Sequence, residues 1–372
     1  MTGSASTDNS EGQTLGGSMR KNICSISVTV WIALLGCAGI ASAPASTAAT
    51  ASETGLILVS DSTDENAPAN ICVMKPDGTL VRYLTHDNNW NRNAGWSYDG
   101  TKVVWNVRNS TGGIWIMDAN GDHKKELTAL PSGAPSHAFG PAFSPDGEHV
   151  VYCDYANGNP GSDPLIGIEV FVMNVNGSDK RKLTTTTVSG TTNTGTVIRW
   201  SIRPAYSPDG KKIVYASTQS GNSEIWVMNS DGRDQKQLTF NTATNSTQGP
   251  DANFPSYSPD GKKIVFLGGW ETMYGNICVM NADGSDRKQL THNADDGRQM
   301  DEPSSDEPAW SADGNSIIFD SNQYDPHLGR RAAETWIMNA AGSNQRVFIP
   351  HMYGEGRNPW INDPLSHTVR AR

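Results

Sequence analysis

Aromatic and arginine side chains gather in the irregular segments of this sequence. Nine of them have the chemistry of an interaction surface: Trp90, Tyr155, Trp200, Trp270, Tyr274, Tyr324, His327, Arg330 and Arg331. Trp, Tyr and Arg anchor protein and carbohydrate interfaces because each combines a large contact area with a hydrogen-bonding group. These residues therefore predict a binding patch, and the alternative is that they cover small cores of their own loops.

Histidines in the same segments raise the question of catalysis. They are His86, His137, His292, His327 and His351. Imidazoles on one face could transfer protons or bind a metal, but their spacing forms no metal motif, which favours ordinary surface histidines. The sequence also contains no G-x-S-x-G element for a hydrolase nucleophile. We therefore assign no catalytic residue and lean towards a protein that is not an enzyme.

One acidic segment, HNADDGRQMDEPSSDEP, has candidate ligands for Ca²⁺. The oxygen donors are Asp295, Asp296, Asp301, Glu302 and Asp306. Carboxylates so close together suit a hard cation. Their spacing differs from that of an EF-hand loop, which favours a solvated acidic loop, and no other cofactor is expected.

Composition limits the classes of partner. The 372 residues have a formal net charge of −10, and the Lys and Arg residues form no block. A nucleic-acid surface needs clustered cations, so nucleic acid is not an expected partner. With 37 Gly, 20 Pro and many Ser, Thr and Asn residues, the chain has the profile of short strands joined by tight turns.

The N-terminal region resembles an export signal. Residues 19–43 contain Arg20 and Lys21, an apolar run and then small residues, which predicts a signal peptide preceded by an extension at 1–18. The apolar run is too short for a convincing membrane span. Either cleavage follows Ala43 or Ala45, or Cys37 in the sequence LLGC is lipidated. Residues 44–54 would form a flexible leader, and the protein is expected in the periplasm or outside the cell, with or without a lipid anchor.

A repeat covers most of the remaining chain. The nine residues YSPDGKKIV occur at 206–214 and again at 257–265, within a unit that reads aromatic-S-P-D-G, apolar strand, loop, I-W-V-M-N, D-G and K-x-L-T. The two turn sequences join short alternating strands into hairpins. Two hairpins per unit predict a four-stranded antiparallel blade, and a series of such units predicts a β-propeller.

The fold prediction is all-β: a six-bladed propeller over residues 55–363, followed by a tail at 364–372. The first unit lacks its first strand, and residues 356–362, GRNPWIN, resemble one, so a C-terminal strand should close the ring in the N-terminal blade. Residues just before each first strand should enter the central channel: Asn93, His137, Arg203, Asn253, Glu307 and Arg357. They would hold an ion or a small anion there, or form a hydrated plug without a ligand.

The repeats, such as PAFSPDG…VFVMNVNGSDKRKLT and PAYSPDG…EIWVMNSDGRDQKQLT, resemble those of the TolB-type, WD-like propeller family. The resemblance covers residues 55–363 and lacks the N-terminal domain of TolB. It implies a non-catalytic module that binds a protein or cell-envelope partner through its variable loops, and a peptidoglycan-associated lipoprotein is one such partner. The alternative is a carbohydrate-active lyase or hydrolase that uses the same face. We expect a monomer.

Overall fold

A computed structural model describes residues 25–28, 56–62, 68–75, 79–108, 112–129, 136–156, 167–186, 191–192, 195–196, 200–240, 252–268, 275–293, 305–311, 313–321, 324–325, 330–331 and 334–349. These residues form strands and turns and contain no helix, and therefore none long and apolar enough to cross a membrane. The all-β prediction is confirmed.

The strands form six antiparallel sheets of four, which we number in chain order. Sheet 1 contains β1 (Ser25–Val28), β2 (Ile57–Ser62), β3 (Ala69–Met74) and β4 (Leu80–Tyr83). Sheet 2 contains β5 (Asn91–Trp96), β6 (Lys102–Val107), β7 (Gly113–Asp118) and β8 (Lys125–Glu126). Sheet 3 contains β9 (Phe139–Phe143), β10 (His149–Tyr155), β11 (Ile168–Asn174) and β12 (Arg181–Lys182).

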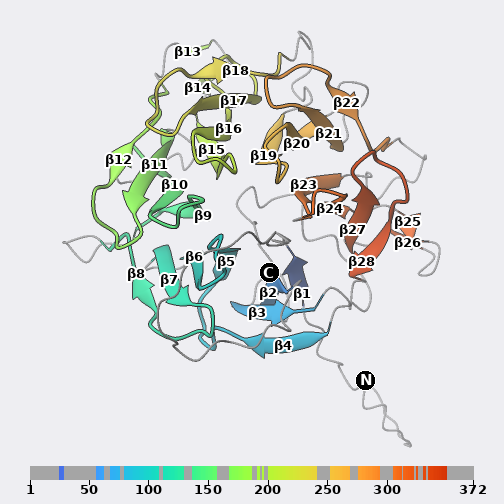
Figure 1. Cartoon of the computed structure of the whole chain (residues 1–372). Coiled ribbons are helices and arrows are strands. Elements are labelled where there is room, and N and C mark those ends of the chain that lie inside the picture. The colour runs from blue at the N-terminus through green and yellow to red at the C-terminus, as the bar shows by residue number, and fades with distance from the viewer. Residues whose placement is uncertain are drawn as a thin grey trace, which may run out of the picture.

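Sheets 4 to 6 repeat this order. Sheet 4 contains β15 (Ser201–Tyr206), β16 (Lys212–Ser217), β17 (Glu224–Asn229) and β18 (Lys236–Gln237). Sheet 5 contains β19 (Asn253–Tyr257), β20 (Lys263–Gly268), β21 (Asn276–Asn281) and β22 (Lys288–Gln289). Sheet 6 contains β23 (Ser305–Trp310), β24 (Ser316–Ser321), β27 (Glu334–Asn339) and β28 (Arg346–Ile349). The sheets surround a central axis, with the first strand of each innermost and the last strand at the rim (Figure 1).

The closing strand differs from the prediction. The neighbour of β2 is β1, which pairs Ser25 with Ser62 and Val28 with Val59, whereas residues 356–362 lie outside the described part of the chain. Five complete blades, not six, therefore lie within the predicted propeller segment 55–363. The innermost strand of sheet 1, β1, therefore comes from the segment that was predicted to be the signal peptide. A sequence repeat cannot foresee this, because β1 does not contain the repeat.

Each S-P-D-G turn is held by the same hydrogen bonds. In sheet 4 the Ser207 hydroxyl donates to Asp209 Oδ1 at 2.6 Å and accepts from the Lys212 backbone amide at 2.9 Å. Gly210 takes the left-handed conformation, with φ of 72°, that the end of this turn requires. The S-x-D-G turns of sheets 2, 3, 5 and 6 repeat these contacts, so the face of the disc that contains them is regular. We call it the turn face.

The K-x-L-T threonine clamps the other hairpin on the opposite face. In sheet 4 the Thr239 hydroxyl accepts from the Ile225 amide at 2.9 Å and donates to Glu224 Oε2. In sheet 5 Thr291 accepts from the Ile277 amide at 2.9 Å and donates to Asn276 Oδ1. Both threonines are buried. The repeat is thus explained by buried backbone groups that need partners.

Neighbouring sheets pack through the turn glycines and apolar side chains. A Cβ added at Gly177 would lie 2.9 Å from the Leu127 carbonyl oxygen of the preceding sheet. A Cβ added at Gly232 would meet the Leu183 carbonyl oxygen in the same way. One buried apolar cluster includes Leu58 of sheet 1 and Ile318 of sheet 6, so the first and last sheets are in contact. The cores between sheets therefore form a closed ring.

Candidate functional site

The variable connections lie on the face opposite the turn face, which we call the loop face. Here each first strand begins, each second strand ends and each third strand begins. Two of these connections contain an extra hairpin in the described part of the chain: β13 (Thr191–Thr192) with β14 (Gly195–Thr196), and β25 (Tyr324–Asp325) with β26 (Arg330–Arg331). Tyr324 thus pairs with Arg331, which brings two predicted binding residues together in one ladder.

Trp90 and Trp200 occupy one repeated position on this face. Each precedes the first strand of its sheet and forms a parallel bridge with the third strand of the sheet before it, Trp90 with Ala69 and Trp200 with Ile168. Both side chains are half-buried. The Arg92 guanidinium carbon lies 4.9 Å from the centre of the Trp90 ring, which is cation–π geometry.

His137 has the corresponding position in sheet 3. Its ring meets that of Tyr155 edge-on with centroids 5.8 Å apart, and the imidazole is exposed while the phenol is half-buried. The sequence analysis predicted His137 as a channel residue, but it lies three residues before the position in the repeat that Asn93 and Arg203 occupy. The structure instead groups His137 with Tyr155 on the loop face.

Phe240 was missed by sequence reasoning. It directly follows the clamp threonine of sheet 4, and 64% of its side chain is exposed, the largest value among the large apolar residues described. The available signal was its position, where sheets 1 and 5 have His86 and His292. We call Trp90, His137, Tyr155, Trp200 and Phe240 the loop-face arc, since they follow one another over sheets 2 to 4.

The innermost strands contain the predicted channel residues. Each of these strands in sheets 2 to 6 has a bulge with one residue in the left-handed region, namely Asn93, Gly140, Arg203, Phe254 and Glu307. Asn93, Arg203 and Glu307 were expected in the channel, whereas Phe254 takes the place expected for Asn253. The Arg203 guanidinium carbon lies 4.4 Å from the centre of the Phe254 ring.

Burial limits what the channel residues can do. Asn93, Arg203 and Glu307 are all buried. Both side-chain polar atoms of Asn93 lack a hydrogen-bond partner among the described residues. A bound water is the usual explanation for such an amide in a polar interior.

The buried carboxylates on the loop-face side are held by structural contacts. Glu169 Oε2 accepts from Thr184, and Oε1 accepts from the Thr186 hydroxyl at 2.7 Å.

Burial raises the pKa of Asp154, which lies near His137. Burial also raises the pKa of Cys153 to about 12. Cys72, Cys153 and Cys278 are buried, and none of the three is part of a disulfide within the described residues.

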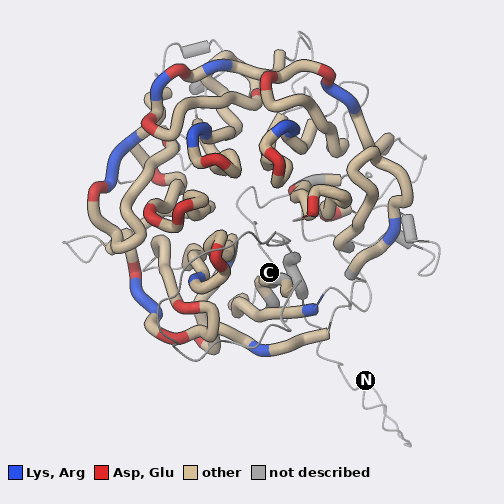
Figure 2. Tube along the Cα trace, viewed as in Figure 1, with Lys and Arg blue, Asp and Glu red and all other residues tan. Residues whose placement is uncertain are grey.

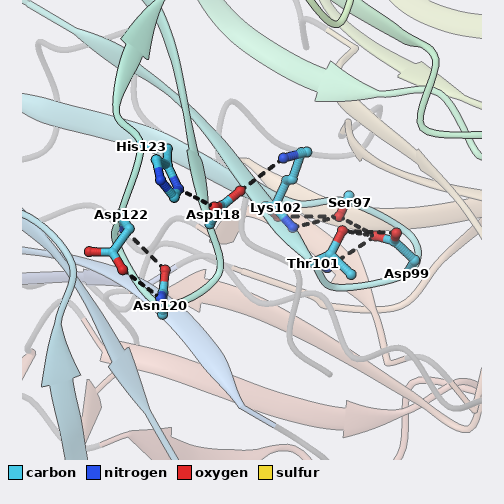
Figure 3. Close-up of polar contacts among 8 residues, drawn as sticks. All are labelled: Ser97, Asp99, Thr101, Lys102, Asp118, Asn120, Asp122 and His123. Atoms are coloured by element: carbon cyan, nitrogen blue, oxygen red, sulfur yellow. Dashed lines mark hydrogen bonds and ion pairs between the residues drawn. The ribbon is translucent and has the colours of Figure 1, made fainter. Parts of the chain in front are cut away.

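On the turn face, sheet 2 has a network of Lys102, Asp118 and His123 (Figure 3). Asp118 accepts from Lys102 Nζ at 2.9 Å and meets His123 Nδ1 at 2.6 Å. These hydrogen bonds, that from Lys102 first, hold the pKa of Asp118 below its usual value. The His123 side chain is 83% exposed. Sheet 4 has the neutral Asn229 in place of Asp118, bonded to Asp234.

Several predicted residues lie outside the described part of the chain: Cys37, Trp270, Tyr274, Asp295, Asp296, Asp301, Glu302, His327, His351 and Arg357. The side chains of Asp306, Tyr324, Arg330 and Arg331 lie outside it as well. Within the residues whose side chains are described, no group of three His, Cys, Asp or Glu could hold a metal ion. The predicted Ca²⁺ site stays a prediction.

Comparisons with curated proteins find distant relatives. The uncharacterized peptidase YuxL of Bacillus subtilis is 23% identical over 265 residues, which cover 71% of this chain and 31% of YuxL. The TolB homolog of Chlorobium luteolum is 28% identical over 186 residues, covering 50% of this chain and 34% of the homolog. The chain thus spans about a third of the length of each of these relatives.

Solved structures share the fold at low identity. TolB from Acinetobacter baumannii superposes with a TM-score of 0.54 at 18% identity, covering 74% of this chain and 58% of that one. An oligogalacturonate lyase in complex with manganese superposes with a TM-score of 0.52 at 13% identity, covering 80% and 74%. The model of the TolB beta propeller domain matches residues 50–253, more than half of the chain. The protein therefore belongs to the TolB β-propeller domain family.

Proposed function

We propose that this protein is an exported, non-catalytic binding module that holds a protein partner against the loop face of its propeller. The observation that carries the proposal is the loop-face arc, in which aromatic side chains remain partly exposed on one side of a disc. The TolB-type fold supports a binding or scaffold role of this kind. The TolB names among its relatives favour a partner in the cell envelope.

The contrast between the two faces supports the choice of surface. On the turn face, polar side chains such as Ser207 and Asp209 form hydrogen bonds to each other within the turns. On the loop face, Phe240 is 64% exposed, and Tyr155 and Trp200, which pack against a buried cluster on one side, are half-buried. Aromatic residues of this kind supply most of the binding energy at protein interfaces, about 2 kcal/mol or more for each hot spot.

The proposal is tested by selecting peptides from a displayed library on the intact chain and measuring their affinities by fluorescence anisotropy. Phe240→Ser and Trp200→Ser should weaken the selected peptides at least tenfold, by about 1.4 kcal/mol. Tyr98→Ser, a half-buried aromatic residue on the turn face, is the matched control and should change nothing. Equal affinity for all three variants would contradict the proposal.

A first candidate partner is a peptidoglycan-associated lipoprotein, tested by co-purification with the full chain. An enzymatic role would instead appear as turnover of a polysaccharide that disappears in His292→Ala or His327→Ala. Such turnover would replace the binding proposal with the carbohydrate-active alternative.

A further inference from the structure

The outer hairpin of sheet 1 departs from the other five at two adjacent positions. In sheets 2 to 6 the second residue after the turn glycine is polar and left-handed, with φ between 50° and 57°: His123, Asp179, Asp234, Asp286 and Asn344. The next residue is Lys124, Lys180, Gln235, Arg287 or Gln345. Sheet 1 has Leu80 and Val81 at these two positions.

The rim strand of sheet 1 also begins closer to its turn glycine. The outer strands of sheets 2 to 6 begin two residues after the left-handed residue; those of sheets 2 to 5 contain two residues each, such as Arg181–Lys182, and β28 of sheet 6 contains four. In sheet 1 β4 begins at Leu80, which pairs with Met74, and it spans four residues to Tyr83, with a register shift between the pairs at Met74 and Val73. β4 is the last strand in the order of its sheet, so among the described strands its outer edge has no neighbour.

The edge at β4 is also apolar and locally basic. Leu80 is 46% exposed and Val81 38% exposed. The sequence of this hairpin, 68–85, contains Lys75 and Arg82 and one acidic residue, Asp77 in its turn sequence. In Figure 2 the rim at β4 is tan and blue, as is the rim at β28, whereas the rims of sheets 2 to 5 show red as well.

Natural proteins protect exposed edge strands with short length and charge, since a long apolar edge pairs with other chains. Sheets 2 to 5 follow this rule. Sheet 1 departs from it at Leu80 and Val81, which replace the polar pair of the other sheets, and exposed apolar residues at an edge mark an interaction site.

We infer that the outer edge of β4 docks an extended segment of a second protein, added as a further strand, whose side chains alternate between apolar and acidic. The apolar residues would cover Leu80 and Val81, and the acidic residues would face Lys75 and Arg82. A second copy of this chain fits less well. Antiparallel self-pairing would place the two Arg82 residues near each other, between chains that each have a formal net charge of −10.

The test uses the full chain and three fluorescein-labelled peptides of eight residues: alternating Val-Glu, alternating Val-Lys and alternating Ser-Gly. Anisotropy should show at least tenfold tighter binding of the Val-Glu peptide than of the other two. The double substitution Leu80→Asp with Val81→Lys installs the pair that sheet 3 uses, so it should fold normally. It should also weaken the Val-Glu peptide at least tenfold.

The matched control is Asp179→Asn with Lys180→Gln in sheet 3, which should leave the affinity for the Val-Glu peptide unchanged. Equal affinity of the Val-Glu and Val-Lys peptides, or an unchanged affinity in the Leu80→Asp, Val81→Lys variant, would overturn the inference. Binding to phosphatidylglycerol vesicles that this variant abolishes, without peptide binding, would replace it with a membrane surface. Concentration-dependent dimerisation that the variant abolishes would replace it with self-association.

Discussion

The clamp threonines provide an internal comparison between a charged and a neutral acceptor. Thr239 donates to the carboxylate of Glu224, and Thr291 donates to the amide of Asn276 in the next sheet. The two threonines are otherwise alike, since each is buried and accepts a backbone amide at 2.9 Å. Replacing each with valine keeps the shape and removes the hydroxyl.

Both substitutions remove the partner of a buried backbone N–H, which costs about 1–3 kcal/mol. Thr239→Val additionally removes a hydrogen bond to a buried carboxylate, worth about 1.5–3 kcal/mol, whereas Thr291→Val removes a neutral bond worth about 1 kcal/mol. We therefore expect Thr239→Val to lower the free energy of unfolding by about 1 kcal/mol more than Thr291→Val.

Urea unfolding followed by tryptophan fluorescence gives both values. A double-mutant cycle with Glu224→Gln isolates the charged bond and should yield a coupling of about 1–2 kcal/mol. Equal destabilisation by the two valine variants, together with a coupling near zero, would refute the reasoning. In that case the threonines act through packing.

Three further predictions concern a turn glycine, an exposed ion pair and a buried thiol. Gly177→Ala should destabilise the fold by more than about 1 kcal/mol, because φ is 89° and the added Cβ meets the Leu127 carbonyl; urea unfolding measures the loss. Asp118→Asn should lower stability by less than about 1 kcal/mol at neutral pH, because the pair with Lys102 is partly exposed. Because the pKa of Asp118 is lowered in the folded state, the stability difference between the wild type and Asp118→Asn should be fully present above the ordinary pKa of 3.8. It should vanish as the pH falls through the lower folded value, and thermal melts at several pH values measure it. Cys153, with a pKa of about 12, should not react with a thiol reagent at pH 8 until denaturant is added, and prompt reaction of the native protein would contradict its burial.

The repeat made the sheets predictable because their turns depend on local chemistry. Ser207, Asp209 and Gly210 form their hydrogen bonds and backbone angles within one short segment, so the sequence motif implies the turn. Strand closure depends instead on which distant segment pairs with β2. In the structure Ser25–Val28 pairs with β2, and this segment does not contain the repeat sequence.

The sequence indicated where the candidate site residues lie, and their role in binding stays a prediction. Trp90, Tyr155 and Trp200 stand out as large aromatic residues beside the variable connections, and the fold places them on the loop face. Phe240 was missed because exposure cannot be read from a single phenylalanine beside a strand. His137 was expected at the position that Gly140 takes in sheet 3, because a glycine at the left-handed bulge has no side chain that would mark it in the sequence.

Hydroxyl-radical footprinting of the intact protein with a bound partner or selected peptide tests the central claim most directly. Binding through the loop face predicts that oxidation of Trp200 and Phe240 falls severalfold in the complex, while oxidation of Tyr98 on the turn face stays unchanged. Protection of Tyr98 with no protection of Trp200 and Phe240 would contradict the account.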